Sequence, residues 1–303
     1  MMELTDFQRK TAALLPEILL KMDEPMSKHT SFRIGGPAEV MAFPKTEEEL
    51  SKILKLSELL DSKIAILGAG TNVLAPDAGL PGLTVCLKDA LTGCEQVDAA
   101  TIRVAAGVTM RKAAVFAAER SLSGLEFAHG IPGTVGGGVY MNAGAYGGEI
   151  AQVCTRVAVL DRTGEKRILS GSQMEFSYRR SVLEERPWVV LWAEFTLTPG
   201  VEAEIRERME ALQNRRRASQ PLDYPSAGSA FKRPAGGYAA ALIDEAGLKG
   251  FSVGGAGISA KHAGFAVNLG GATAEDVKSL LRQVSDRVFA GSGIRLEPEI
   301  RIW

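Results

Sequence analysis

The sequence predicts an α+β protein, and three observations support this class. Stretches with apolar residues at helical spacing, such as residues 46–60, alternate with short runs of strand-forming residues. Residues 153–160 and 189–197 are typical of antiparallel strands, and a hairpin turn is predicted at residues 161–164. A break at residues 198–200 then precedes an amphipathic helix, which indicates that a new lobe begins there.

Composition excludes several classes of protein. A chain of 303 residues exceeds one typical domain and should form two or three lobes with ample core. The formal net charge of −1 gives no electrostatic support for a nucleic-acid or membrane partner. The three cysteines have no CxxC spacing and do not cluster with the three histidines, so neither a metal site nor a disulfide framework is expected. The charged N-terminal segment and the lack of a long apolar run predict a cytoplasmic protein.

The first lobe should combine short strands with two well-marked helices. Thr46 followed by Glu49 forms a capping box, and Thr109 is the N-cap expected for an alanine-rich helix. The elements predicted in chain order are a helix before residue 23 that is interrupted at Pro16, a strand pair over 29–44, a helix over 46–60, strands over 64–67, 83–87 and 101–105, and a helix over 109–120.

Nine glycines crowd the stretch from Gly124 to Gly148, and no regular helix or strand would tolerate that number. Glycine lets consecutive amide N–H groups converge on an anion, so this stretch is expected to hold a phosphate-bearing cofactor. Tight turns that join core strands are the alternative explanation. A second anion-binding loop, GAGTN at residues 68–72, follows a predicted strand. It lacks the third glycine of the dinucleotide fingerprint because Val73 occupies that position, and a Rossmann fold is therefore not favoured.

The second lobe is predicted to contain three helices and a last strand. Gly247 closes the middle helix, and Thr273 caps the final one. The predicted elements are an amphipathic helix over 201–212 that runs toward the basic residues 215–217, a helix over 239–246, a helix after 273, and a strand over 294–303.

Few residues carry chemistry by their own pattern. Ser229 lacks the GxSxG context of a hydrolase nucleophile and is consistent with a turn or a helix cap. Arg179 is one of 35 basic residues, and Glu299 shares a strand face with Glu297 and Arg301, as on an exposed edge strand. Positive or protonatable groups of the second lobe would suit an anionic substrate or simply a solvated surface; these are Lys232, Arg233, Lys261 and His262.

Seven segments in order resemble one known family. They are GAGTNVL, GLEFAHGIPGTVGGGVYMNAGAYGG, FSYRRSVL, PSAGSAFKRP, LIDEAGLKG, ISAKHAGFAVN and LEPEIRIW. Together they resemble the UDP-N-acetylenolpyruvoylglucosamine reductases of bacterial peptidoglycan synthesis, over nearly the whole chain. The resemblance implies a two-part FAD-binding fold of the vanillyl-alcohol-oxidase type and a separate α/β substrate lobe. The implied boundaries are 1–89 and 90–199 for the two FAD-binding subdomains, 200–290 for the substrate lobe, and 291–303 for a strand that returns towards the FAD lobe.

The resemblance also implies the reaction and the roles of individual residues. In that family NADPH reduces FAD, and hydride then passes to the enolpyruvyl ether of UDP-N-acetylglucosamine enolpyruvate. By position Ser229 would donate the proton, while Arg179 and Glu299 would stabilise the enolic intermediate through its carboxylate. Arginine suits this task because its planar fork is permanently charged. Glu297 lies two residues too early for the family's glutamate.

Cofactor and substrate contacts follow from the same resemblance. Those implied for FAD are Gly68, Gly70, Thr71, Asn72, Gly133, Thr134, Asn142, Gly144 and Arg301. Those implied for the substrate are Tyr178, Lys232, Lys261 and His262. The chain resembles the subclass that lacks the insertion bearing a substrate-covering tyrosine, because few residues separate Ser181 from the strand at Val189.

Two other functions stay open at the level of the sequence. One is a different flavin oxidoreductase of the same cofactor fold that acts on small alcohols or hydroxy acids and has no need of Ser229. The other is a nucleotide-binding module without catalysis, which would be colourless when purified.

Overall fold

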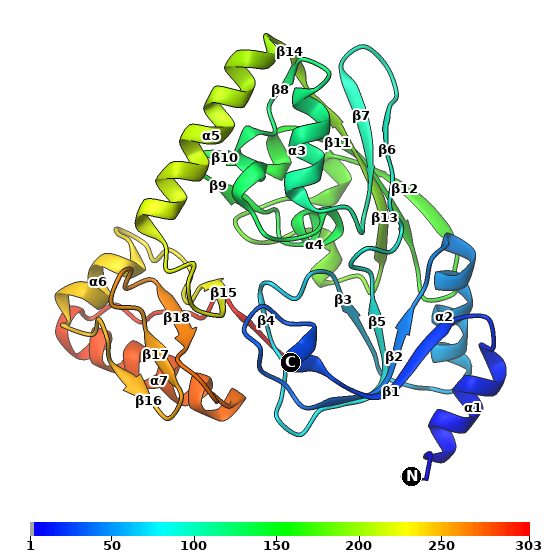
Figure 1. Cartoon of the computed structure of the whole chain (residues 1–303), viewed down its shortest axis with the longest axis horizontal. Helices are drawn as coiled ribbons and strands as arrows, with labels where there is room; N and C mark the ends of the chain where they lie inside the picture. The colour runs from blue at the N-terminus through cyan, green and yellow to red at the C-terminus, as the bar shows by residue number, and fades with distance from the viewer. Residues whose placement is uncertain (1–2) are drawn as a thin grey trace. The chain divides into compact units, whose positions relative to one another are not determined.

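The computed structural model describes residues 3–303, and internal contacts divide this part of the chain into two compact units. The first contains the described residues up to Met22 with Glu39–Ala69 and Pro81–Asn214, and the second contains Asp23–Ala38, Gly70–Leu80 and Arg215–Trp303. Both units combine helices with mostly antiparallel sheets, so the predicted α+β class is confirmed (Figure 1).

The N-terminal segment forms a helix followed by a strand. α1 (Asp6–Leu14) begins with a capping box, in which Thr5 and Gln8 each accept the other's backbone N–H. It ends before Pro16, and the following residues form β1 (Leu19–Pro25), whose side chains alternate between exposed and half-buried. The helix predicted up to residue 23 is therefore wrong beyond α1, because Pro16 stops it and the period-two pattern of a strand takes over.

β1 joins a four-stranded sheet in the order β1-β2-β5-β3. Its other strands are β2 (Pro37–Phe43), β5 (Leu80–Cys86) and β3 (Ile64–Leu67), and β3 runs parallel to β5. Of the strand pair predicted over 29–44, only the second half is a strand. The residues before it take turns instead, and Arg33 and Gly35 have φ angles of 56° and 128° that a strand cannot contain.

α2 (Glu47–Leu59) packs against this sheet and begins, as predicted, after Thr46. The Thr46 hydroxyl accepts the N–H of Glu49, but the Glu49 carboxylate accepts the N–H of Lys45 rather than that of Thr46. Only half of the predicted capping box therefore forms. The inward face of α2 is buried in one core with the sheet and consists of Leu50, Ile53, Leu54 and Leu56.

A larger sheet of the first unit has five antiparallel strands in the order β12-β11-β13-β7-β6. Its strands are β12 (Lys166–Ser170), β11 (Cys154–Leu160), β13 (Val189–Thr196), β7 (Thr101–Ala105) and β6 (Cys94–Gln96). α3 (Met110–Ala118) and α4 (Val135–Tyr140) share a core with one face of this sheet. The predicted hairpin joins β11 to β12, where Asp161 Oδ1 accepts the N–H groups of Thr163 and Glu165.

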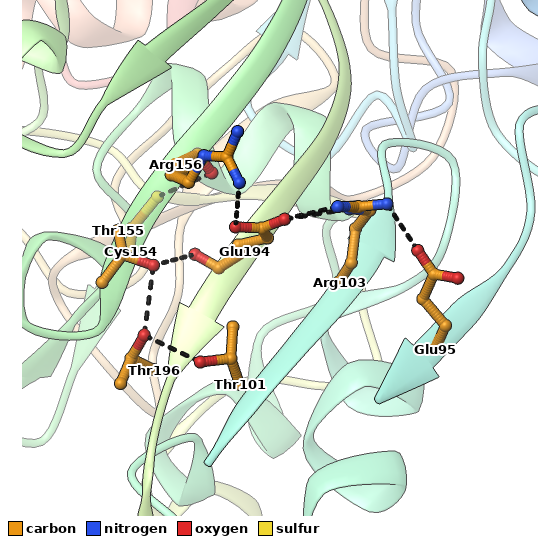
Figure 2. Close-up of polar contacts among 8 residues, drawn as sticks. All are labelled: Glu95, Thr101, Arg103, Cys154, Thr155, Arg156, Glu194 and Thr196. Atoms are coloured by element: carbon orange, nitrogen blue, oxygen red, sulfur yellow. Dashed lines mark hydrogen bonds and ion pairs between the residues drawn. The ribbon is translucent and has the colours of Figure 1, made fainter. Parts of the chain in front are cut away.

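Charged residues of alternating sign cross the opposite face of this sheet, and Figure 2 shows them side by side. The row consists of Glu95, Arg103, Glu194 and Arg156, each paired across the strands with the next. Glu194 is 3% exposed and accepts hydrogen bonds from Arg103 Nε and Nη2 at 3.1 and 2.6 Å and from Arg156 Nη1 at 3.4 Å. Two partly exposed arginines thus neutralise one buried carboxylate.

The second unit contains a sheet in the order β15-β18-β17-β16 and two helices. These elements are β15 (Ser226–Ser229), β16 (Ser252–Val253), β17 (Ala256–Ile258), β18 (Phe265–Asn268), α6 (Ala239–Glu245) and α7 (Ala274–Ser292). As predicted, Thr273 caps α7. Two segments from the first third of the chain are bonded into this unit. Asn268 Nδ2 donates to the Phe32 carbonyl at 3.0 Å, and the Asp77 carboxylate accepts backbone N–H groups at the start of α7.

The C-terminal residues are less regular than the predicted strand over 294–303. Only β19 (Arg301–Ile302) forms, parallel to β4 (Val73–Leu74), and Pro298 makes an isolated bridge with Phe231. Pro298 cannot donate to a ladder, which explains why the strand does not extend further toward the N-terminus. Across residues 3–303, no helix has the length and apolar character needed to cross a membrane.

The remaining regular elements are short, apart from one long helix that begins in the first unit. They are β8 (Leu122–Ser123), β9 (Gly144–Ala145), β10 (Gly148–Glu149), β14 (Thr198–Pro199) and α5 (Glu202–Ser219). The 3₁₀ turns are η1 (Met26–Lys28), η2 (Glu126–Gly130), η3 (Ile150–Gln152), η4 (Ser172–Met174) and η5 (Val182–Glu184).

Replacing Glu194 with glutamine should lower the free energy of unfolding by about 2 kcal/mol, because two arginines lose the anion that they share. Urea titration followed by circular dichroism measures this loss. The matched control is Glu95→Gln at the exposed end of the same row, which should cost less than about 0.5 kcal/mol. Equal losses for the two variants would contradict a central role for the buried carboxylate.

Candidate functional site

The glycine-rich stretch folds into α4 and the turns on either side of it. Thr134 is the N-cap of α4, and its hydroxyl accepts the N–H of Gly137 at 3.5 Å. The N–H of Met110 donates to the carbonyl of Gly133 at 2.9 Å, which ties this turn to the start of α3. The sequence therefore forms a compact corner at which the turn before α4 is hydrogen-bonded to the start of α3.

α4 contains three consecutive glycines, a costly choice for a helix because each loses more conformational entropy than alanine. A Cβ at Gly136 or Gly138 would press on a neighbouring side chain at 3.0 or 2.7 Å, so close packing explains these two. Gly137 is exposed, and a Cβ there would meet nothing nearer than Thr134 Oγ1 at 3.5 Å. Gly137 is thus the glycine of α4 that close packing does not require.

The loop after β3 reaches the same corner. A Cβ at Gly68 would lie 2.5 Å from Thr134 Oγ1, so the two predicted anion-binding loops meet within the first unit. Hydroxyl and amide groups at such a meeting point are the donors that a diphosphate requires, which fits a phosphate-bearing cofactor.

The continuation of this loop belongs to the second unit. Gly70 has a φ of 62°, and a Cβ there would lie 2.2 Å from the His29 carbonyl, so packing requires glycine. Asn72 follows Thr71 and is bonded to the C-terminal segment: its carbonyl accepts the N–H of Arg301 at 3.0 Å, and its Nδ2 donates to the carbonyl of Glu299 at 3.2 Å. This places three predicted residues in direct contact.

Arg179 lies at a turn that the glycine-rich stretch holds in place. It has a φ of 56°, which is uncommon for a residue with a side chain, and its Nη2 donates to the Gly144 carbonyl at 3.3 Å. The neighbouring Tyr178 is exposed. Asn142 is buried and donates from Nδ2 to the carbonyl of Ser177 at 3.0 Å, while its Oδ1 accepts the N–H of Ala151. The Asn142 side chain therefore positions the turn that carries Arg179.

Ser229 and Glu299 lie close together in the second unit. Ser229 is the last residue of β15, after a bulge at which Gly228 has a φ of 78°, and bulges of this kind redirect side chains. The N–H of Glu299 donates to the carbonyl of Ala230, the residue after Ser229, at 2.9 Å. Lys232 follows with an ion pair to Glu297 at 3.2 Å. Glu297, which lies outside the family's glutamate position, is thus the ion-pair partner of Lys232.

His262 and Lys261 differ in what they offer to a ligand. His262 Nδ1 accepts the N–H of Gly264 at 3.1 Å, so the other ring nitrogen carries the proton. Burial lowers the pKa of His262, and the charge of Lys249 lowers it further, which leaves a neutral donor near neutral pH. Lys261 Nζ donates to the carbonyl of Arg217 at 2.7 Å, at the C-terminal turn of α5.

The predicted site residues therefore form one group in each unit. The first unit holds Gly68, Gly133, Thr134, Asn142, Gly144, Tyr178 and Arg179, and the second holds Gly70, Thr71, Asn72, Ser229, Lys232, Lys261, His262, Glu299 and Arg301. Tyr238, at the start of α6, was not among the predicted residues. Its signal in the sequence is weak: one aromatic residue after two glycines.

A hollow of about 610 Å³ on the first unit involves none of the predicted residues. Its lining consists of Ala151, Cys154, Thr155, Ser170, Gly171, Ser172, Glu175 and Phe176. Burial raises the pKa of the Cys154 thiol to about 12, and the charge of Glu194 adds to the shift. The thiol therefore stays protonated at neutral pH and cannot act there as a nucleophile. In residues 3–303, no group of three or more acidic, histidine or cysteine side chains could hold a metal ion.

Comparison with known proteins extends over both units. Residues 220–303 match the family described as UDP-N-acetylenolpyruvoylglucosamine reductase, C-terminal domain, and residues 38–170 match an FAD binding domain. The UDP-N-acetylenolpyruvoylglucosamine reductase of Agathobacter rectalis is 44% identical, with 98% of each chain covered. The enzyme of that name from Caldanaerobacter subterraneus is 46% identical, over 97% of this chain and 96% of the relative.

A solved structure agrees with these matches. The crystal structure of UDP-N-acetylenolpyruvylglucosamine reductase from Thermus caldophilus superposes with a TM-score of 0.79 at 34% identity, and it covers 95% of this chain and 99% of its own. The match to an FAD binding domain and this superposition confirm the predicted FAD-binding fold with a separate C-terminal lobe.

Alanine at Gly68 should destabilise the first unit by roughly 1–2 kcal/mol, because the new Cβ displaces the Thr134 hydroxyl that caps α4. Thermal unfolding measures this loss. Gly137→Ala is the matched control: it should leave stability unchanged or raise it by up to about 1 kcal/mol, since alanine favours a helix. It should nevertheless lower the flavin-to-protein ratio of the purified protein. Unaltered stability of Gly68→Ala would contradict the contact with Thr134.

Stability should fall as the pH drops, in part because of His262. The pKa of His262 is lowered in the folded state, so below about pH 6.5 the unfolded state binds more protons than the folded state. The stability that is present above that pH is therefore lost as the pH falls through the pKa of the folded state. In His262→Asn, the amide oxygen can still accept the N–H of Gly264, and the loss between about pH 7.5 and 5 should be smaller. Melting temperatures at both pH values test this, and equal losses in the two proteins would refute it.

Proposed function

The chain belongs to the UDP-N-acetylenolpyruvoylglucosamine reductase family, and on this basis we propose that it reduces UDP-N-acetylglucosamine enolpyruvate to UDP-N-acetylmuramate for peptidoglycan synthesis, with FAD as cofactor and NADPH as electron donor. The observation that carries this proposal is full-length similarity at 44–46% identity, which spans the FAD binding domain and the family's C-terminal domain together.

FAD, when bound, takes hydride from NADPH and supplies it to the enolpyruvyl double bond. The residues that would hold its diphosphate are small or hydroxyl-bearing: Gly68, Thr134 and the exposed Gly137 in the first unit, with Thr71 in the second. Backbone N–H groups and hydroxyls suit an anion, and no carboxylate stands among them to repel it. Gly133, Asn142, Gly144, Gly70, Asn72 and Arg301 complete the proposed cofactor set.

The proposed chemical step needs one proton donor and two groups that hold the substrate carboxylate. Ser229 would give its hydroxyl proton to the carbon next to the one that receives hydride. A serine is a weak acid, so it can do this only where the acceptor is strongly basic and water is excluded. The bulge before Ser229 and the backbone bond from Glu299 to Ala230 support these roles, because they hold the two segments that carry these side chains next to each other.

Arg179 would bind the carboxylate of the enolpyruvyl group. A guanidinium offers two parallel N–H donors and keeps its charge at every relevant pH, so it can stabilise the enolate that forms when hydride arrives. Its backbone is held in a left-handed conformation by the turn that Asn142 supports, which restricts the directions available to the side chain. Glu299 would share a proton with the same carboxylate.

The proposed function also assigns roles to the remaining predicted residues and segments. The UDP-sugar would be contacted by Tyr178, Lys232, Lys261 and His262. FAD would be bound by residues 1–89 and 90–199, and the substrate by residues 200–290. The last segment, residues 291–303, would return towards the FAD lobe. The neutral ring of His262 would donate one hydrogen bond rather than a charge. Three free cysteines suit a reducing compartment, which supports a location in the cytoplasm.

Stopped-flow absorbance separates the two half-reactions and tests this function. NADPH should bleach the flavin of the wild-type holoenzyme, and UDP-N-acetylglucosamine enolpyruvate should restore its colour. Ser229→Ala should leave the first phase intact and slow the second by roughly 100-fold or more, the scale for loss of a general acid. Ser226→Ala, on the same strand, should leave both phases unchanged. If wild-type reduced flavin is not reoxidised by the substrate, the proposed function fails.

A further inference from the structure

The loop that follows Ser229 displays an aromatic ring covered on one side by an arginine. Tyr238 is 61% exposed, and the guanidinium carbon of Arg233 lies 4.1 Å from the centre of its ring. Arg233 Nε also donates to the carbonyl of Gly237 at 3.3 Å, which fixes the guanidinium against the loop. An isolated surface pair of this kind is common and adds little stability. The pair alone therefore does not distinguish a binding loop from an ordinary surface loop.

The residues of this loop are poorly suited to stability. Tyr238 is the N-cap of α6 and makes no side-chain cap bond, although serine, threonine, aspartate or asparagine would do so at this position. A Cβ at Gly236 or Gly237 would meet no atom within 4 Å, so close packing explains neither glycine, although the φ of 82° at Gly236 itself favours glycine. A large exposed ring at a helix start, directly after Gly237, which neither packing nor a positive φ requires to be glycine, breaks local rules in the way that binding sites do.

A chain of contacts sets a limit on the distance between the ring and the proposed proton donor. The N–H of Ala230, next to Ser229, donates to the carbonyl of Gly264 at 2.8 Å. A Cβ at Gly264 would touch the Cβ of Ala240 at 3.2 Å, and Ala240 lies two residues after Tyr238. Counting one residue step or one contact at a time, Tyr238 is within roughly 20 Å of Ser229. An extended nucleoside diphosphate sugar has a comparable length.

We propose that the uracil ring of the UDP-sugar stacks on the open face of Tyr238, and that Arg233 positions the tyrosine from the other face. This rests on the proposed function, and it names the residue that holds the nucleoside end of the substrate while Ser229 acts at the sugar end. Every base has a flat π-face, and stacking on tyrosine needs no pocket around it. An arginine on the opposite face adds charge and limits ring rotation.

The test compares Tyr238→Ala with Tyr238→Phe in the FAD-loaded enzyme. If the ring stacks on uracil, Tyr238→Ala raises the KM for the UDP-sugar and the Kd for UDP, measured by calorimetry, by roughly 10- to 100-fold. The kcat and the rate of flavin reduction by NADPH stay at wild-type values. Tyr238→Phe keeps the ring and stays within about 3-fold of wild type. Folding should be preserved because Tyr238 makes no cap bond, and the melting temperature of each variant checks this.

Two further variants sharpen the result. Arg233→Met should raise the KM by roughly 2- to 5-fold, less than loss of the ring itself. The matched control is Phe289→Ala, which removes another exposed aromatic residue of the second unit that stacks with an arginine, Arg295, at 4.5 Å. It should leave the KM unchanged.

Each outcome counts for or against the stacked ring. Unchanged KM and Kd in Tyr238→Ala would overturn the proposal. So would a Tyr238→Phe variant that is as impaired as Tyr238→Ala, or an Arg233→Met variant that is more impaired than Tyr238→Ala. Failure of the proposed function looks different: the wild-type flavin would not be reoxidised by the UDP-sugar. In that event, binding of UDP to the wild type with loss in Tyr238→Ala would still support the nucleoside site.

Discussion

The first unit depends on backbone segments that pack against neighbouring side chains more closely than a Cβ would allow. α4 reaches its neighbours only because Gly136 and Gly138 have no Cβ, and the loop after β3 reaches Thr134 only because Gly68 has none. Such close packing costs conformational entropy at each glycine, and tertiary contacts have to offset it. The same property that closes the corner leaves peptide groups near its surface, where Gly137 is exposed. Two closely packed glycines and one exposed glycine therefore lie side by side in one short helix.

The second unit solves a different problem, which is to hold two residues from distant parts of the chain. Ser229 and Glu299 are separated by 69 intervening residues, yet a single backbone hydrogen bond from Glu299 to Ala230 joins their segments. Asn72 bonds to the carbonyl of Glu299 and the amide of Arg301, so a loop from the first third of the chain supports the same place. These bonds are directional, and at Glu299 they use the backbone N–H and carbonyl, so the Glu299 side chain is not needed to hold its segment in place.

Much of this arrangement could be predicted from the sequence, and the failures have physical causes. Helices with clear caps, at Thr46, Thr109 and Thr273, appear where periodicity placed them. β1 was missed because a half-buried strand of seven residues carries a weak pattern, and the last strand was overextended because alternation in LEPEIRIW outweighed Pro298. The site residues came from a family pattern rather than from their own chemistry. No pattern reveals that residues 23–38 and 70–80 pack with the C-terminal segment, since hydrogen bonds such as Asn268 to Phe32 have no local signature.

The charged row on the five-stranded sheet has a consequence for how the sheet assembles. Sliding one strand by a single residue turns its charges to the apolar face, and sliding it by two sets Arg103 or Arg156 opposite an uncharged neighbour instead of Glu194 (Figure 2). Either slip leaves the buried carboxylate of Glu194 without its arginine partners. The ion pairs of Glu194 therefore favour one register of β13 against both β7 and β11 over any slipped register.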